Sequence, residues 1–480
     1  MIILARAPFL VILASLAAML ALFDRFAGAF GLMSLFALLF AAGLLTSSFR
    51  IDIKGQWRVA AFVIVCTFLC SLWIAAVLNR KPSIPPFVKT TGIVVESRPW
   101  GRLYAVAVET PEGGFVLKRP VSGLPEGDRV RIEGVPRPFR GAEEESRNRS
   151  GSDFREDRFW YARGMTAQLI SARIEFLPER WSLHRWRYRL YRALTVQLPG
   201  LTAAYLNAAW TGKRDAALND AHRSWGTSHL LAVSGFHVGI VMLCSSTFFR
   251  RGKTRVFCLS TLLWLYIFLT GAPASAIRAG VMIQIALLGE LAGRPASAVN
   301  SVSLAAVLLL LHSPYQFWDI GWRLSVLAAL VIAAVVERGN PKDWRVWFAI
   351  SPMVWLTTFP QVSWTFKSVP LVGMLINLVA SPFFGFAFSF ASVVAGLHLL
   401  GIPGMGLFLQ ALEGAFALWG IAADALALWI PQQLEWNPFF TYCCAGIFIT
   451  LLCRAFFVPW RNVAVLAPLG SLAAFVLFGG

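Results

Sequence analysis

Apolar segments long enough to cross a lipid bilayer recur along the whole of this 480-residue sequence. A helix needs about 20 consecutive apolar residues to span the hydrocarbon core. Candidate segments lie at 2–22, 26–49, 59–78, 229–249, 256–270, 275–292, 298–311, 320–336, 345–359, 371–398, 405–429, 439–457 and 462–479. Several are short or interrupted by glycine and proline. The pattern therefore predicts a polytopic α-helical membrane protein with about 10–13 spans, some broken or re-entrant. With 57% hydrophobic and 14% charged residues, the composition excludes an ordinary soluble globular protein.

Two short basic loops predict the orientation of the chain in the membrane. Residues 50–58 and 250–255 connect apolar segments and are rich in Lys and Arg, so both are expected on the cytoplasmic side. This places the N-terminus in the cytoplasm and residues 81–227 outside the cytoplasmic membrane. The first apolar run is long and a second follows closely, so we interpret it as a retained helix and not as a cleaved signal peptide.

Residues 81–178 have the pattern of a small β domain. The runs TTGIVVESR, LYAVAVET, GGFVLKRPV and DRVRIEGV alternate in polarity and are separated by the turn sequences PEGG and LPEGD. They predict an inserted, extracytoplasmic small β-barrel of OB-like type, a fold often used to bind single-stranded nucleic acid. The candidates for a DNA-binding face are Arg98, Trp100, Arg102, Lys118, Arg119, Arg129 and Arg131. The alternative is that these are ordinary solvated strand residues.

Residues 179–227 follow this domain and are expected to form interfacial amphipathic helices. Within residues 181–198, WSLHRWRYRLYRALTVQL, arginines alternate with Trp and Tyr. Such a helix is typical of a membrane surface, with its rings at headgroup depth. Its cations, Arg185, Arg187, Arg189 and Arg192, would face lipid phosphate or a passing polyanion.

Residues 228–239, SHLLAVSGFHVG, place polar side chains inside an apolar segment. His229, Ser234, Gly235 and His237 are costly there unless they face protein or water. Ser234 and Gly235 also predict a break in the helix. On a continuous helix the two histidines would be about 12 Å apart, and no carboxylate cluster accompanies them, which argues against a metal site. The roles that remain for the two histidines are hydrogen-bonded packing and the lining of a pathway.

Arg278 lies in the interrupted segment GAPASAIRAGVM. Ser275 and the backbone N–H groups at the start of its helix would add hydrogen-bond donors for an anion. The alternative is a structural ion pair of Arg278 with Glu290 or Asp319.

Three further polar residues have two interpretations each. Asp319 and Arg323 are four residues apart, and we favour a structural role in which they neutralise one another on one helix face. Asn377, near the start of a long apolar segment, is either a contact between helices or part of a pore lining.

Four runs, taken in chain order, resemble the ComEC competence-protein family. They are LNAAWTGKRDAALNDAHRSWGTSHLLAVSGFHVGIV at 206–241, GAPASAIRAGVM at 271–282, WDIGWRLSVLA at 318–328 and NLVASPFFG at 377–385. Upstream, LPEGDRVRIEG and SDFREDRFWYARGMTA resemble the start and end of the OB-like domain of this family. The resemblance implies an inner-membrane channel that conducts single-stranded DNA into the cytoplasm during natural transformation. It would comprise N-terminal transmembrane helices at 1–80, a channel domain at 228–457 and a C-terminal transmembrane segment at 458–480.

A DNA strand carries one phosphate charge per nucleotide, so its pathway needs donors and positive potential within the bilayer. We expect Ser234, His237, Ser275, Arg278 and Asn377 along that pathway, with His229, Gly235, Asp319 and Arg323 in structural roles. The alternative is a membrane transporter or assembly platform of the same fold for another polyanion or lipid.

No enzymatic activity, cofactor or metal is expected. The sequence contains no G-x-x-x-x-G-K-[ST] loop, and its six histidines include no H-x-H-x-D-H run. The metallo-β-lactamase-like domain of many family members is therefore expected to be missing. The resemblance implies an external DNA receptor, a cytoplasmic helicase-like motor and, for strand degradation, a separate nuclease, with membrane lipids as surroundings.

Overall fold

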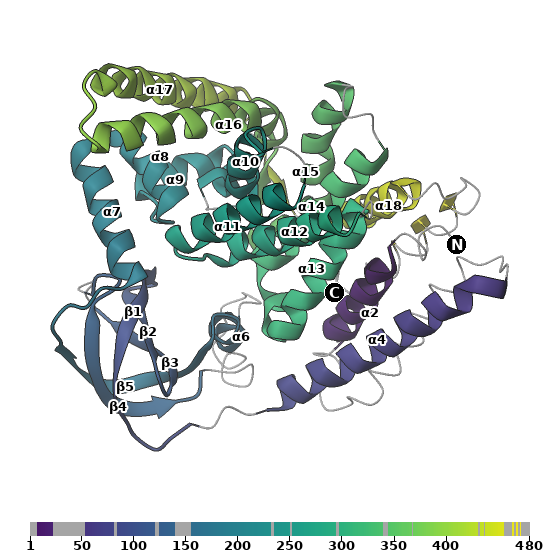
Figure 1. Ribbon diagram of the computed structural model, residues 1–480, viewed down its shortest axis with the longest axis horizontal. Coiled ribbons are helices and arrows are strands. Elements are labelled where there is room, and N and C mark those ends of the chain that lie inside the picture. The colour runs from purple at the N-terminus through teal and green to yellow at the C-terminus, as the bar shows by residue number, and fades with distance from the viewer. Residues whose placement is uncertain are drawn as a thin grey trace.

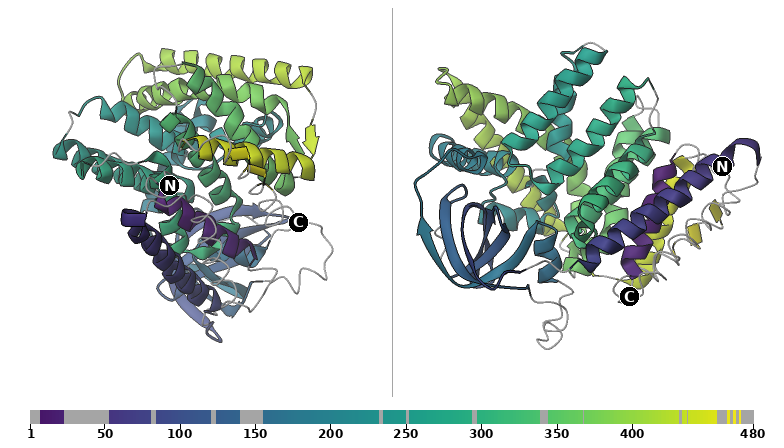
Figure 2. Two further views of the ribbon diagram at one scale, coloured as in Figure 1. Left: turned by 90° about the vertical axis from the view of Figure 1, so that its right-hand side faces the viewer. Right: turned by 60° about the horizontal axis from the view of Figure 1, so that its bottom comes forward.

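The computed structural model describes residues 7–22, 53–80, 84–120, 124–139, 155–231, 235–249, 252–293, 297–338, 344–366, 368–430, 433–435, 437–455, 463–464, 467–468 and 471. A β-barrel lies beside a larger assembly of helices (Figure 1). In the right-hand view of Figure 2 the barrel occupies one end, and the teal and green helices extend away from it.

Five helices are long and apolar enough to cross a membrane in the part of the chain that the structure describes. They are α4 (Ile53–Asn79), α12 (Ala274–Leu291), α14 (Ile320–Arg338), α16 (Val372–Leu399) and α17 (Met405–Trp429). Four other apolar helices are shorter: α2 (Pro8–Leu22), α10 (Gly235–Ser246), α13 (Ala298–His312) and α18 (Pro438–Ala455). The chain is thus a polytopic helical membrane protein. The expected count of about 10–13 spans stays a prediction.

Most predicted spans coincide with helices. The predicted basic loop at 50–58 is helical from Ile53 onward, because α4 begins there. The predicted span at 229–249 contains most of the 3-10 turn η1 (Ser228–Leu231) and all of α10, and residues 232–234 between them lie outside the described residues. The predicted spans at 26–49 and, for most of its length, 462–479 lie outside the described residues.

The first core of the bundle joins the N-terminal helices to the middle of the chain. α2 and α4 pack with α13 and α14, and Leu16, Ile74 and Leu310 are buried there. α11 (Lys253–Leu269) and α15 (Trp344–Phe366) complete the central layer. A two-stranded sheet of β6 (Ser368–Pro370) and β7 (Gln433–Glu435) ties the start of α16 to the end of α17.

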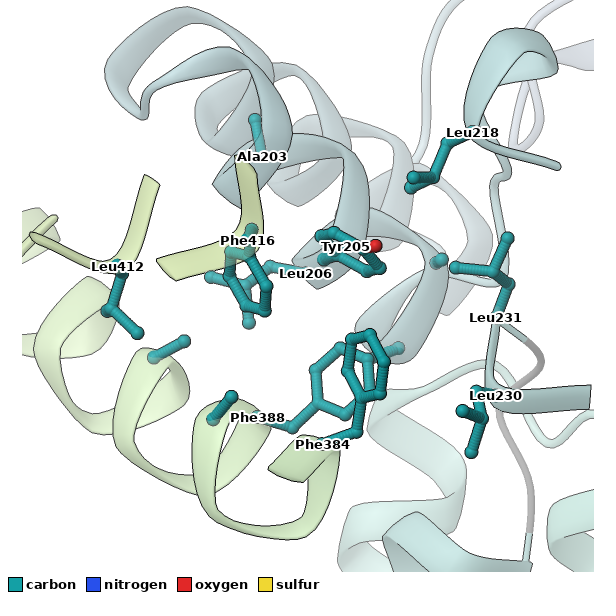
Figure 3. Close-up of a cluster of buried hydrophobic side chains, with 14 of the residues drawn as sticks. Ala203, Tyr205, Leu206, Leu218, Leu230, Leu231, Phe384, Phe388, Leu412 and Phe416 are labelled. Carbon is teal, nitrogen blue, oxygen red and sulfur yellow. The ribbon is translucent and has the colours of Figure 1, made fainter. Parts of the chain in front are cut away.

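The second core is built from α8 (Gly200–Trp210), α16 and α17. Tyr205 of α8 is buried between Phe384 and Phe416, with ring centroids 5.2 and 4.4 Å away (Figure 3). The carboxylate of Glu413 in α17 accepts the backbone N–H groups of Leu201 and Thr202 at 2.8 Å, which caps the first turn of α8. The prediction of an interfacial amphipathic helix is therefore wrong for α8, which lies inside the bundle.

Five strands form a closed barrel in the order β1-β2-β3-β5-β4. They are β1 (Val88–Trp100), β2 (Leu103–Thr110), β3 (Gly113–Arg119), β4 (Arg129–Arg137) and β5 (Met165–Phe176). Only β3 and β5 pair in parallel among these strands; the other four pairings are antiparallel. The barrel is filled by alternate apolar residues, including Val94, Val106, Phe115, Val130 and Leu169. β5, which the sequence reading did not identify as a strand, closes the barrel.

The short helix α6 (Glu156–Tyr161) lies between the barrel and the bundle (Figure 1). Its Trp160 is buried against the barrel side. On the other side, the Arg158 guanidinium lies 4.1 Å from the ring of Trp318, in the 3-10 turn η2 (Pro314–Trp318) that precedes α14. α6 therefore holds the barrel against the start of α14.

Candidate functional site

The polar segment SHLLAVSGFHVG contains two helical elements, with residues 232–234 between them outside the described residues. The 3-10 turn η1 (Ser228–Leu231) covers the start of the segment, and α10 begins at Gly235. Ser234 lies outside the described residues. The predicted break at Ser234 and Gly235 therefore stays a prediction.

A buried hydrogen-bonded group fixes the approach to this segment. His222, in α9 (Ala216–Ser224), lies 2.9 Å from the hydroxyl of Tyr205 through Nε2 and 2.8 Å from the hydroxyl of Thr227 through Nδ1. Burial lowers the pKa of His222 to about 4, so the ring is neutral at physiological pH. The neutral ring thus connects α8, α9 and η1.

The backbone of Gly226 crosses the start of α16 at very close range. A Cβ atom at Gly226 would lie 3.0 Å from the Cα atom of Gly373, and Gly226 has a φ of +69°. The amide of Asn377 donates to the Gly226 carbonyl at 3.3 Å. Asn377 is therefore a contact between helices, which is one of its two predicted roles; a lining role stays a prediction.

The two histidines of the polar segment have different surroundings. His237 is buried, with its ring 4.8 Å from that of Phe388. His229 is exposed in the structure. Gly235 is also exposed, and a Cβ atom there would lie 3.2 Å from the Cβ atom of Ala279 in α12. Among the described residues, no group of three or more His, Cys, Asp or Glu is placed to hold a metal ion.

Arg278 is buried in the second turn of α12, with 5% of its side chain exposed. Its Nη2 donates to the Gly321 carbonyl at 3.0 Å, its Nη1 lies 3.9 Å from Asp319 Oδ2, and its Nε has no hydrogen-bond partner. Of the two predicted carboxylate partners, Asp319 is therefore the one nearby. Glu290 instead pairs with Arg255 at 2.5 Å. Ser275 lies one turn earlier and is half-buried.

Asp319 sits between η2 and α14, and its carboxylate is directed toward Arg278. Arg323 donates through Nε to the carbonyl of Phe317 at 2.6 Å, and its guanidinium lies 4.8 Å from the ring of that residue. These contacts brace the turn that presents Asp319.

Arginines from the barrel side converge on the same place. Arg163, in the turn after α6, is within Coulombic range of Glu96, Asp319 and Arg98, and Arg278 is within range of Arg163. Arg214, between α8 and α9, is within range of Arg98. We call Arg98, Arg163, Arg214 and Arg278 the arginine cluster. It extends from the barrel into the bundle.

Two members of the arginine cluster are exposed yet partly surrounded by protein, and we call their surroundings the recess. The side chains of Arg163 and Arg214 are exposed to solvent, yet desolvation by the surrounding protein lowers the pKa of each. Both remain fully charged at neutral pH because an arginine pKa starts far above it. Arg163 is also held by the carbonyl of Phe159 at 3.0 Å.

The barrel candidates fall into two groups. Arg98, Trp100 and Lys118 lie against α6, where the ring of Trp100 is 5.3 Å from those of both Phe159 and Trp160. The Lys118 ammonium pairs with Glu156 at 2.7 Å. The Trp100 ring is thus packed against two aromatic rings, which limits its use as a platform for bases.

The remaining barrel candidates lie at strand ends or on β4. Arg102 and Arg119 are exposed around the β1–β2 turn and the end of β3. Arg129 and Arg131 pair with the first half of β1, whereas Arg98 lies in its second half. Arg131 contacts Glu175 at 2.7 Å. Of the seven candidates, Arg98 is the one that joins the arginine cluster.

The helix α7 (Leu183–Gln197) directs two of its arginines toward the barrel. Arg187 pairs with Glu126 at 2.7 Å in a buried contact and also reaches the Gly271 carbonyl at 3.4 Å, just before α12. Arg185 pairs with Asp128 at 2.6 Å. The prediction that these two cations face lipid or a polyanion is therefore wrong, because both join the barrel to the bundle.

The comparisons with known proteins agree with the position of this site. The competence protein family matches residues 210–462, which is more than half of the chain. The chain belongs to the competence protein family. The matched segment contains η1 and α10, together with Arg214, Arg278 and Asp319, and the barrel precedes it. Family membership connects the chain with competence.

Two curated relatives match part of the chain. ComE operon protein 3 of Bacillus subtilis (strain 168) is 30% identical over 190 residues, which are 38% of this chain and 24% of that protein. An uncharacterized protein of Aquifex aeolicus (strain VF5) is 28% identical over 189 residues, 39% of this chain and 45% of that protein. The matches thus span less than half the length of either relative. No solved structure matches the chain.

Proposed function

We propose that this protein conducts single-stranded DNA across the cytoplasmic membrane into the cytoplasm during natural transformation. The observation that carries the proposal is the arginine cluster, which leads from the barrel through the recess to Arg278 inside the bundle. A phosphate-bearing strand cannot enter hydrocarbon without water and compensating cations. A line of cations entering the bundle supplies the compensating charge.

The charges along this line favour phosphate contacts over recognition of bases. Arg163 and Arg214 have no ion pair with a carboxylate in the described part of the chain at salt-bridge distance, and Arg98 has one contact of 3.3 Å with Glu96. Trp100 is packed against α6. The cluster therefore suits a ligand that is recognised through its backbone, without dependence on base sequence.

The barrel supports the proposal through its strand order. Five strands closed in the order β1-β2-β3-β5-β4 fit a Greek-key barrel of OB-like type, which often binds single strands. In the proposed topology the N-terminus is cytoplasmic and residues 81–227, which include the barrel, face the outside of the cytoplasmic membrane. The strand would meet the barrel first and Arg278 second.

The proposed role requires no chemistry from this chain. An external receptor would deliver the DNA, a cytoplasmic helicase-like motor would pull it, and a separate nuclease would degrade the other strand. His237, Ser275 and Asn377 lie on α10, α12 and α16 and are proposed to line the conduit together with Arg278.

A second candidate is transport or binding of another polyanion or of a phosphate-bearing lipid, because the arginine cluster recognises charge. A competition binding assay distinguishes this second candidate from single-stranded DNA. If single-stranded DNA binds to the purified protein and inorganic polyphosphate or anionic vesicles displace it poorly, DNA is the ligand. Equal displacement would favour the second candidate.

The direct test measures entry of labelled DNA into the cytoplasm of a transformable strain that depends on this gene. Deletion is expected to abolish entry and leave external DNA binding intact. Arg278→Gln is expected to act like the deletion at an unchanged protein level in the membrane. Arg255→Gln is the matched control, because Arg255 pairs with Glu290 outside the cluster. Normal transformation after deletion would overturn the proposal.

A further inference from the structure

Asp319 lies between two cations of the arginine cluster. Its Oδ2 is 3.9 Å from Arg278 Nη1, and it is also within Coulombic range of Arg163 on the barrel side. The Asp319 side chain is 19% exposed, compared with 5% for Arg278. A phosphate that moves from the recess toward Arg278 would therefore meet this carboxylate.

The contact between Asp319 and Arg278 is loose for a buried ion pair. Charge-assisted hydrogen bonds between N and O measure about 2.7–2.9 Å. The buried pair of Arg187 and Glu126 in the same protein has this length, at 2.7 Å, whereas Arg278 and Asp319 are 3.9 Å apart. Arg278 Nε has no hydrogen-bond partner. The guanidinium therefore keeps donor capacity that Asp319 does not use.

Gly321 leaves room beside the pair. A Cβ atom at Gly321 would lie 3.3 Å from Asp319 Oδ2 and 3.7 Å from Arg278 Nη2. The absence of a side chain lets the carboxylate shift relative to the guanidinium without a steric clash.

We propose that Asp319 is a selectivity-determining residue, an internal anion that occupies Arg278 when no strand is present and gives way to the phosphates of a polyanion. The inference rests on the proposed role of Arg278 in the conduit. A buried cation needs a counter-charge, and Asp319 supplies it, so a small anion gains little by binding and is repelled by the carboxylate. A strand contacts several arginines at once, and these linked contacts offset the displacement of Asp319.

The experiment removes the charge of Asp319 and asks whether small anions take its place. The Tm of the purified wild type and of Asp319→Asn is measured in sodium gluconate, sodium chloride and sodium iodide at equal ionic strength. Iodide influx is measured in vesicles that contain either protein. We expect the Tm of Asp319→Asn to rise from gluconate to chloride and iodide, with iodide influx above that of wild type. Wild type is expected to show neither effect. Glu290→Gln, which breaks a pair outside the cluster, is the control and should behave like wild type.

Two further variants keep the inference testable. Gly321→Ala retains both charges but crowds the carboxylate, so it should show the same anion response in weaker form if Asp319→Asn does not fold. Arg278→Gln combined with Asp319→Asn should be stable, indifferent to anions and unable to bind single-stranded DNA at this position.

Three results would overturn the inference. The first is that the wild type responds to anions as strongly as Asp319→Asn. The second is that neither Asp319→Asn nor Gly321→Ala responds to anions. The third is that the double variant Arg278→Gln with Asp319→Asn takes up DNA normally. The melting and influx measurements use no DNA. An anion response in a protein that binds no DNA would therefore refute the proposed function while the selectivity role stands.

Discussion

Arg187 of α7 and Glu126 of the barrel form an ion pair 2.7 Å long, with 10% and 9% of their side chains exposed. The same guanidinium reaches the carbonyl of Gly271, where a Cβ atom would lie 1.7 Å from Arg187 Nη1 and the backbone has a φ of +85°. Gly271 directly precedes the first turns of α12, which carries Arg278. The position of the barrel is thus tied to the helix that carries the buried arginine.

Glu126→Gln is expected to destabilise the joint between barrel and bundle by about 3–5 kcal/mol, because it leaves Arg187 buried without a counter-charge. The measurement is the free energy of unfolding in detergent together with proteolysis of the joint. The matched control is Glu175→Gln, which breaks the exposed pair with Arg131 and is worth about 0–1 kcal/mol. Equal effects of the two substitutions would contradict the role of the buried pair.

Arg163→Ala and Arg214→Ala are expected to weaken binding of single-stranded DNA without lowering the Tm, because both side chains are exposed in the recess. Each lost phosphate contact should reduce the slope of log affinity against log salt concentration by about 0.7. Arg119→Ala, an exposed arginine outside the cluster, is the control. Identical salt slopes for all three variants would remove Arg163 and Arg214 from the pathway.

Gly226→Ala is expected to displace η1 from α16 and lower both stability and DNA entry. The new methyl group would lie 3.0 Å from the Gly373 Cα atom in a backbone conformation with a φ of +69°. Gly404→Ala separates the effect of backbone strain from the effect of the close contact with Gly373. Gly404 has a φ of +84° but nothing within 4 Å of its added Cβ atom. Thermal melting and membrane levels are the measurements. If Gly404→Ala is equally damaging, backbone strain and not the helix crossing is responsible.

His222 is expected to make stability depend on pH. Its pKa is about 4 in the folded protein, below the ordinary value near 6.5, so the unfolded chain binds the proton first as pH falls. Neutral His222 therefore contributes up to about 3 kcal/mol to the free energy of unfolding. This contribution is fully present above about pH 6.5 and is lost as the pH falls toward 4. Between pH 7.5 and 4.5, the Tm of His222→Gln should fall less steeply than the Tm of wild type. Parallel curves would contradict this account.

The sequence predicted the long helices well because their apolar runs end at glycine and proline. The segments at 371–398 and 405–429 correspond within one residue to α16 and α17. α8 was misplaced, although GLTAAYLNAAW is apolar on all sides, which is the signal of a buried helix. Four barrel strands were anticipated from alternation and turns. β5 was not, because it pairs with β3 in parallel across a long separation in sequence.

The candidate site was predicted in part. The resemblance brought out Arg278 and Asp319, and the structure brings them together. Arg163 and Arg214 lie within sequence runs that carry the resemblance, but nothing local marks them as neighbours of the barrel and the bundle. Their convergence depends on how α6 packs between the two, which periodicity and spacing do not encode.

The most direct measurement is a structure of the protein with a bound single-stranded oligodeoxynucleotide. The account predicts phosphates within hydrogen-bond distance of Arg163 and Arg278, with Asp319 moved away from the guanidinium. A strand that binds elsewhere while Arg278 keeps its contact with Asp319 would contradict the account.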